Sequence, residues 1–64
     1  MPAIKKIIGV KIERTEYEYV VRTYVAGPNG QRVRYPRADY YAGGLSAEDK
    51  LDAIQTADYM LKHN

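Results

Sequence analysis

Residues 19–35 read YVVRTYVAGPNGQRVRY, and this stretch decides the fold. At its centre, Gly-Pro-Asn-Gly has the composition of a tight turn, because proline presets φ at about −65° and glycine tolerates a positive φ. Residues typical of β-strands lie on both sides of this turn. The stretch therefore predicts an antiparallel hairpin with a short loop, whose second strand begins near Gln31 and continues through Val33 and Tyr35.

A further strand is predicted before this hairpin. Ile8, Val10 and Ile12 alternate with polar residues, as in a strand with one buried face. From Tyr17 onward, the apolar residues occupy odd-numbered positions instead. Because side chains alternate strictly along a strand, this change of parity predicts a turn or a bulge near residues 13–16.

The segment after the hairpin carries two breaks. Pro36 has no backbone N–H to donate, so it marks an edge position or a bulge. Beyond it, we expect the chain to stay extended to about Tyr41. Gly43 and Gly44 then end the strand region and free the backbone to turn.

Residues 47–62 carry the pattern of an amphipathic helix. Ser46 is a typical N-cap residue, and Asp49 follows three residues later, close to a capping box. Acidic residues cluster in the first turns and Lys62 lies in the last, which suits the helix dipole. Apolar residues recur at helical spacing: Leu51, Ile54, Ala57 and Leu61.

The order of elements is strand, strand, strand, helix, within a single domain over residues 1–64. This order predicts the α+β class: a three-stranded antiparallel β-meander with one C-terminal amphipathic helix packed on one face (β-β-β-α). The predicted core consists of side chains from the sheet and the helix: Val10, Ile12, Tyr19, Val21, Val25, Val33 and Tyr35, with Leu51, Ile54, Ala57 and Leu61. Because Ile54 is expected to be buried, Ile54→Ala is expected to cost about 2–5 kcal/mol.

The other face of the sheet is expected to be uncovered and basic. Alternation places eight side chains there: Lys11, Glu13, Glu18, Val20, Arg22, Tyr24, Arg32 and Arg34. Residues 19–37 carry four arginines and no acid, whereas residues 38–64 carry five acids against two lysines; the net charge is +2. The candidate residues for binding nucleic acid or another partner are Lys11, Arg22, Tyr24, Arg32, Arg34 and Arg37.

These residue types favour nucleic acid, with DNA as the first choice. Arginine pairs with phosphates or guanine edges through its forked donors, and Tyr24 can stack on an exposed base. The element order is similar to that of tyrosine-recombinase arm-binding domains and AP2 domains, which lay a three-stranded sheet on DNA. The similarity is one of architecture; the chain carries no residue motif of those domains, so no functional residue is transferred from them. Glu13 and Glu18 oppose this interpretation, because they repel phosphate.

A protein-interaction module is the alternative. All seven aromatic residues are tyrosines, and tyrosine and arginine are enriched in the most strongly binding parts of protein interfaces. Tyr40 and Tyr41 either project as an aromatic pair or divide between the core and the surface. An inhibitor or adaptor of phage or mobile-element type belongs to this class, and an exposed edge strand can pair with its copy in a homodimer.

Other function classes lack the residues they need. The chain has no cysteine and one histidine, His63, and its only serine, Ser46, is explained as a helix cap. We therefore expect no enzyme, no metal site and no cofactor. No apolar run approaches the roughly 20 residues of a membrane span, and no signal-peptide pattern is present, so we expect a cytoplasmic protein with no membrane contact.

Overall fold

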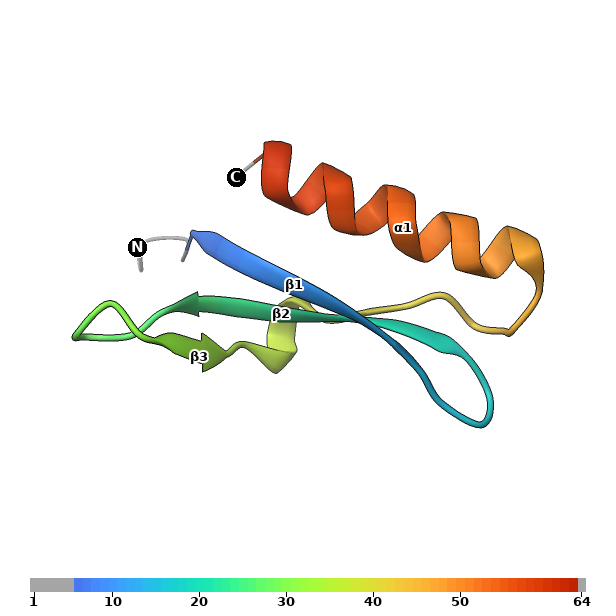
Figure 1. Ribbon diagram of the computed structural model, residues 1–64, viewed down its shortest axis with the longest axis horizontal. Coiled ribbons are helices and arrows are strands. Elements are labelled where there is room, and N and C mark those ends of the chain that lie inside the picture. Colours follow the sequence, from blue (N-terminus) through green and yellow to red (C-terminus); the bar gives the residue numbers. More distant parts are fainter. Residues whose placement is uncertain (1–5, 64) are drawn as a thin grey trace.

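Six elements of secondary structure follow one another along residues 6–63, the part of the chain that the computed structural model describes (Figure 1). They are β1 (Ile7–Arg14), β2 (Tyr19–Ala26), β3 (Arg32–Arg34), the short 3-10 helix η1 (Pro36–Ala38), β4 (Tyr40–Tyr41) and α1 (Ala47–Lys62). The strands form one antiparallel sheet in the order β1-β2-β3, and β4 also pairs with β2, beyond the end of β3. Helix α1 packs on one face of this sheet, which confirms the predicted α+β class.

The chain between β3 and β4 is not extended throughout, and this corrects the prediction from the sequence. Strand β3 ends at Arg34, and Pro36 opens η1 at a position where a helix needs no backbone donor. The chain then returns to β2, where β4 pairs with Val20 and Val21. The single third strand that we expected is therefore two short strands on the same edge of β2, separated by η1.

A tight turn without glycine or proline joins β1 to β2. The amide of Thr15 donates to the carbonyl of Glu18 at 2.9 Å. The Thr15 hydroxyl accepts hydrogen bonds from the amides of Tyr17 and Glu18 at 3.2 and 3.1 Å, as serine and threonine often do in turns. This turn lies slightly later than residues 13–16, where the change of parity predicted it.

The turn between β2 and β3 forms where Gly-Pro-Asn-Gly predicts it. The amide of Gly27 donates to the carbonyl of Gln31 at 2.7 Å, and the amide of Gly30 donates to the carbonyl of Gly27 at 3.0 Å. Gly30 has a φ of 80°, a left-handed conformation that residues with a Cβ rarely adopt. This turn sets the register of the hairpin, in which Val25 pairs with Val33.

Helix α1 begins at the capping box that the sequence predicts. The Ser46 hydroxyl accepts a hydrogen bond from the Asp49 amide at 3.1 Å, and the Asp49 carboxylate accepts one from the Ser46 amide at 3.1 Å. Gly44 leaves room for the Asp49 carboxylate before the cap, because a Cβ at this position would force that side chain to move. The helix ends at Lys62, so the predicted bounds of 47–62 are confirmed.

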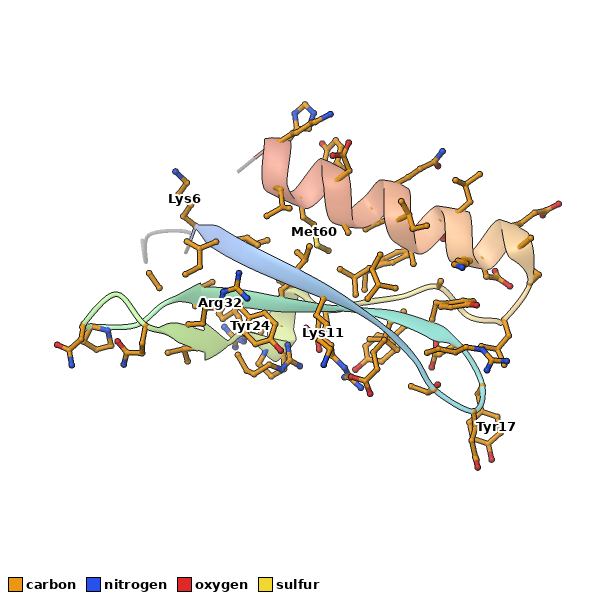
Figure 2. The ribbon with its side chains drawn as sticks, in the orientation of Figure 1. Lys6, Lys11, Tyr17, Tyr24, Arg32 and Met60 are labelled. Carbon is orange, nitrogen blue, oxygen red and sulfur yellow. The ribbon has the colours of Figure 1, made fainter. Side chains whose placement is uncertain are left out.

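The core beneath α1 is small. Its buried members are Val21, Ala53 and Ala57. Partly buried side chains pack around them: Val10, Tyr19, Tyr40, Ala42 and Met60. Met60 points from α1 toward the sheet (Figure 2). With only alanines at its buried positions, α1 contributes little volume to this core.

The buried stripe of α1 is shifted from the predicted one, although Ala57 is buried as predicted. Leu51, Ile54 and Leu61 were expected in the core, yet they are 45–52% exposed, whereas Ala53 is fully buried. The prediction that Ile54→Ala costs about 2–5 kcal/mol therefore does not hold for the folded chain by itself, since that cost requires a buried side chain.

A contact between distant segments accompanies this orientation of α1. The Tyr40 hydroxyl of β4 donates a hydrogen bond of 2.6 Å to the Asp52 carboxylate. The Asp52 side of the helix lies toward β4, while Ala53 lies on the sheet. The apolar periodicity of the helix carries no information about the position of Tyr40.

Three sheet positions also differ from the prediction. Ile12 and Val33 were expected in the core and are exposed. Ile12 lies on the edge strand, and Val33 lies on β3, whereas α1 packs mainly on β1 and β2. Val20 was expected on the uncovered face and is fully buried, because its neighbours Glu13 and Tyr41 on the adjacent strands flank it from both sides.

Candidate nucleic-acid interface

The predicted basic side chains of the strands share the face of the sheet opposite α1. Arg22 alternates with Val21, which lies beneath the helix, and Lys11 pairs with Arg22 in the sheet. Tyr24 pairs with Arg34 of β3. Arg32 lies two residues before Arg34 on the same strand and therefore on the same face. We call this surface the basic face: Lys11, Arg22, Tyr24, Arg32 and Arg34. Figure 2 shows Lys11 and Tyr24 on the side of the sheet away from α1.

Tyr24 lies beside two guanidinium groups of this face. The Arg34 and Arg32 Cζ atoms are 5.4 and 5.8 Å from the centroid of its ring, within the range of a cation–π contact. Arg32 reaches this place from β3 by extending across the sheet to Gly9 of β1. An added Cβ at Gly9 would lie 3.0 Å from the Arg32 Cζ, so the glycine leaves the space that the guanidinium occupies.

A buried carboxylate, Asp39, organises the other arginines, and the sequence analysis did not single it out. Its side chain is 1% exposed and lies on the edge of β2, between the ends of β3 and β4. It accepts hydrogen bonds from the amide and hydroxyl of Thr23 at 2.9 and 3.0 Å. It also accepts bonds of 3.0 and 2.6 Å from Nη1 and Nη2 of Arg34, which form a bidentate pair.

Arg22 is paired with the same carboxylate and with a second one. Its Nη1 is 3.5 Å from Asp39 Oδ2, and its Nε is 3.4 Å from Glu13 Oε2. The contact with Glu13 is the main cause that raises the pKa of Arg22, and the contact with Asp39 is the main cause that raises the pKa of Arg34. Both guanidiniums therefore stay charged, with their charges compensated inside the protein.

Three of the six candidate binding residues are cations whose charges no carboxylate compensates. Within the described part of the chain, no acidic side chain forms an ion pair with Lys11, Arg32 or Arg37. All three are exposed, and Arg37 lies on η1 rather than on the strands of the basic face. The positive charge available to a ligand is thus smaller than the number of arginines implies.

The two tyrosines of β4 divide between the two faces of the sheet. Tyr40 packs against the core, and its hydrogen bond to Asp52, together with partial burial, raises the pKa of its hydroxyl. Tyr41 pairs with Val20 and therefore points to the face that carries Arg22, where it is 55% exposed. Tyr41 thus adds an exposed ring beside the basic face, although the candidate set from the sequence did not include it.

No group of three or more histidine, cysteine, aspartate or glutamate side chains that could hold a metal ion lies within residues 6–63. His63 stacks on the Tyr59 ring at the end of α1, with 4.3 Å between ring centroids. None of the helices in the described segment is long and apolar enough to cross a bilayer.

We expect the fold to lose stability as the pH falls below about 4. The Arg34 guanidinium, assisted by hydrogen bonds from Thr23, holds the pKa of the Asp39 carboxyl well below its usual range, against the opposing effect of burial. A carboxyl whose pKa is lower in the folded state contributes stability that is complete above its unfolded-state pKa. That contribution is lost as the pH falls toward the folded-state value.

Urea denaturation at about pH 6 and about pH 3 measures this loss. Asp39→Asn removes the titrating group, so its free energy of unfolding should change less between the two pH values than that of the wild type. Asp58→Asn is the control, because Asp58 forms only an exposed pair with Lys62. An equal pH dependence in the wild type and Asp39→Asn would show that Asp39 does not carry the effect.

The sequence does hold a signal for Asp39. It is the only acidic residue between Glu18 and Glu48, and four arginines precede it within residues 19–37. A single acid among several cations is a candidate for their shared partner, since a buried charge requires pairing. The choice of Arg34 and Arg22 as partners depends on the path of η1, which the sequence pattern did not predict.

Comparison of this chain with protein-family models, curated proteins and solved structures found no match.

Proposed function

We propose that the basic face binds nucleic acid, with DNA as the favoured ligand. The position of Arg32 carries this proposal: its guanidinium lies over Gly9 and beside the Tyr24 ring, and no acid of the described residues pairs with it. A guanidinium held there offers its forked donors to a phosphate, while the adjacent ring can stack on a base. Lys11 and the exposed ring of Tyr41 extend the same surface.

Three cations without an internal ion pair supply the phosphate contacts in this proposal: Lys11 and Arg32 of the basic face, and Arg37 of η1, which packs beside β2. Arg22 and Arg34 contribute less, because Asp39 and Glu13 compensate their charges. With three phosphate contacts, the logarithm of the binding constant should fall with the logarithm of the salt concentration at a slope of about −2 for single strands and about −3 for duplexes.

Arg32→Gln is expected to weaken binding and to reduce the magnitude of this slope by about one unit, because one phosphate contact is lost. Fluorescence anisotropy with a labelled single strand of deoxythymidines and with a mixed-sequence duplex, at several salt concentrations, measures both quantities. The single strand tests stacking together with charge, and the duplex tests charge and groove contacts.

Arg14→Gln is the matched control for this experiment. Arg14 is an exposed arginine of the same sheet, but it pairs with Tyr19, which packs against the core on the helix side. We expect Arg14→Gln to leave the slope unchanged. If Arg32→Gln and Arg14→Gln changed the affinity and its salt dependence equally, the binding site would lie elsewhere on the molecule. If the wild type bound neither probe at low salt, the proposed function would be wrong.

A protein partner is the second candidate. The internal pairing of Arg22 and Arg34 lowers the attraction of this face for phosphate, and Glu13 lies on it as well. An exposed tyrosine next to arginines, such as Tyr41, is typical of the residues that dominate protein interfaces. Failure of both DNA probes, together with capture of one defined protein from nuclease-treated lysate that Tyr41→Ser no longer captures, would favour an inhibitor or adaptor.

A further inference from the structure

Strand β1 lies at one edge of the described sheet. It pairs with β2, and from Gly9 to Arg14 no other strand of the described residues pairs with its outer side, which we call the open edge. Val10 lies opposite Thr23, whose amide and carbonyl bond to Asp39 and Tyr35 on the far side of β2. In an antiparallel ladder, the backbone groups of such a pair point away from each other. The backbone N–H and C=O groups of Val10 therefore point to the open edge, and so do those of Ile12, two residues later.

One flank of α1 lies above this edge, and apart from the exposed Lys50 near the start of the helix it is apolar. Asp52 marks the flank that faces β4, because it accepts the hydrogen bond from Tyr40. At about 100° per residue, Ile54 and Leu61 lie on the opposite side of the helix from Asp52, toward β1. Both are about half exposed, and Ile12 is also exposed on the helix side of β1, where it pairs with Val21.

The core by itself buries little apolar surface. The buried residues of α1 are both alanines, while Leu51, Ile54 and Leu61 lie outside. The chain has no cysteine for a disulfide, and residues 6–63 hold no cluster that could bind a metal. Domains of this size with a small core commonly gain the missing burial from another subunit.

We propose that a second copy of this chain docks on this edge, with β1 against the partner's β1 in antiparallel orientation. Residues whose backbone groups point to the open edge must pair with the same kind of residue in the partner strand. Within the regular part of β1, Gly9 to Arg14, a two-fold axis then allows only a few registers. A register centred on Lys11 opposes two lysines, and one centred on Glu13 opposes two glutamates. The register centred on Ile12 instead places Lys11 opposite the partner's Glu13, twice, so charge complementarity selects it.

The same axis brings the two helices into contact. Because α1 lies over β1 and β2, the two helices come to lie about two strand spacings apart, about 10 Å, which is a usual distance for packed helices. Ile54 and Leu61 then meet the apolar flank of the partner's helix. The axis is perpendicular to the sheet, so both basic faces lie on one side of a continuous sheet. The dimer does not depend on what the basic face binds.

Sedimentation equilibrium of the full chain tests this dimer. We expect Ile54→Asp to raise the dissociation constant of the dimer by about 100-fold or more, because each dimer contains two copies of the substitution at a buried apolar contact. Tyr59→Asp is the matched control, since Tyr59 is an exposed apolar residue on the flank of α1 that carries Asp52. It should change the dissociation constant by no more than about threefold.

Exchange of charges tests the register. Lys11→Glu and Glu13→Lys should each weaken the dimer, and the double variant should restore it. Glu13→Lys also removes the contact with Arg22, so recovery in the double variant is the decisive result. Circular dichroism checks that each variant is folded, and Leu61→Asp replaces Ile54→Asp if the latter is not. Three results would overturn the proposal. The wild type could be monomeric at the highest protein concentration measured, or the folded Ile54→Asp or Leu61→Asp variant could still dimerise as tightly as the wild type. The third is a charge-exchanged double variant whose dimer stays as weak as those of the single variants.

Discussion

Asp39→Ala is expected to lower the free energy of unfolding by about 3 kcal/mol. The substitution leaves the buried amide of Thr23 without its acceptor, although the Thr23 hydroxyl keeps the Tyr35 carbonyl at 2.7 Å. It also removes the counter-charge of two guanidiniums. Arg22 and Arg34 are 25% and 36% exposed, so water can partly replace the carboxylate. The loss therefore stays below the cost of leaving a fully buried charge unpaired, and still represents a large share of the stability of so small a domain.

Urea denaturation of a short series measures this loss. Asp39→Asn keeps one acceptor oxygen for Thr23 but removes the charge, so its free energy of unfolding should fall between those of the wild type and Asp39→Ala. Asp58→Ala is the control, because it removes an acid from an exposed pair with Lys62, and such pairs contribute at most about 1 kcal/mol. Equal losses at positions 39 and 58 would contradict the role given to Asp39.

Ala53→Leu is expected to cost about 2–3 kcal/mol, because the side chain at this position is fully buried in the cluster with Val21 and Ala57. The larger side chain forces either the helix away from the sheet or the leucine into an unfavourable rotamer. Gln55→Leu adds an apolar side chain of the same size on the exposed side of α1, and should change stability by less than about 0.5 kcal/mol.

The same denaturation experiment distinguishes the two orientations of the helix. At concentrations where the chain is monomeric, Ile54→Ala should cost less than about 1 kcal/mol, since this side chain is about half exposed. A tolerated Ala53→Leu together with a loss of about 2–5 kcal/mol for Ile54→Ala would instead support the orientation predicted from the apolar spacing.

Much of the local structure was predictable because neighbouring residues determine it. Ser46 and Asp49 satisfy the first amides of α1 by themselves, so the start of the helix needs no distant partner. Gly30 permits the positive φ of the turn between β2 and β3, and thereby sets the hairpin. The alternation of side chains then places Arg22 and Arg34 on one face, whatever covers the other.

The charge state of that face was not predictable in the same way. Asp39 reaches Arg34 and Thr23 because Pro36 turns the chain through η1 rather than letting it continue as a strand. The parity of the strands contains no information about that turn. The count of arginines on the basic face was therefore correct, while the charge that they offer to a ligand was overestimated.

The sequence alone determined the α+β class, the bounds of α1 and the face of the sheet on which the arginines lie, because each follows from contacts a few residues apart. Only the tertiary structure decided which side of α1 is buried and which arginines are neutralised. Both involve contacts between distant segments: Asp52 accepts a hydrogen bond from Tyr40, 12 residues away along the chain, and Asp39 pairs with residues 5–17 positions away. Interactions at that separation require the backbone path to be known before the partners can be identified.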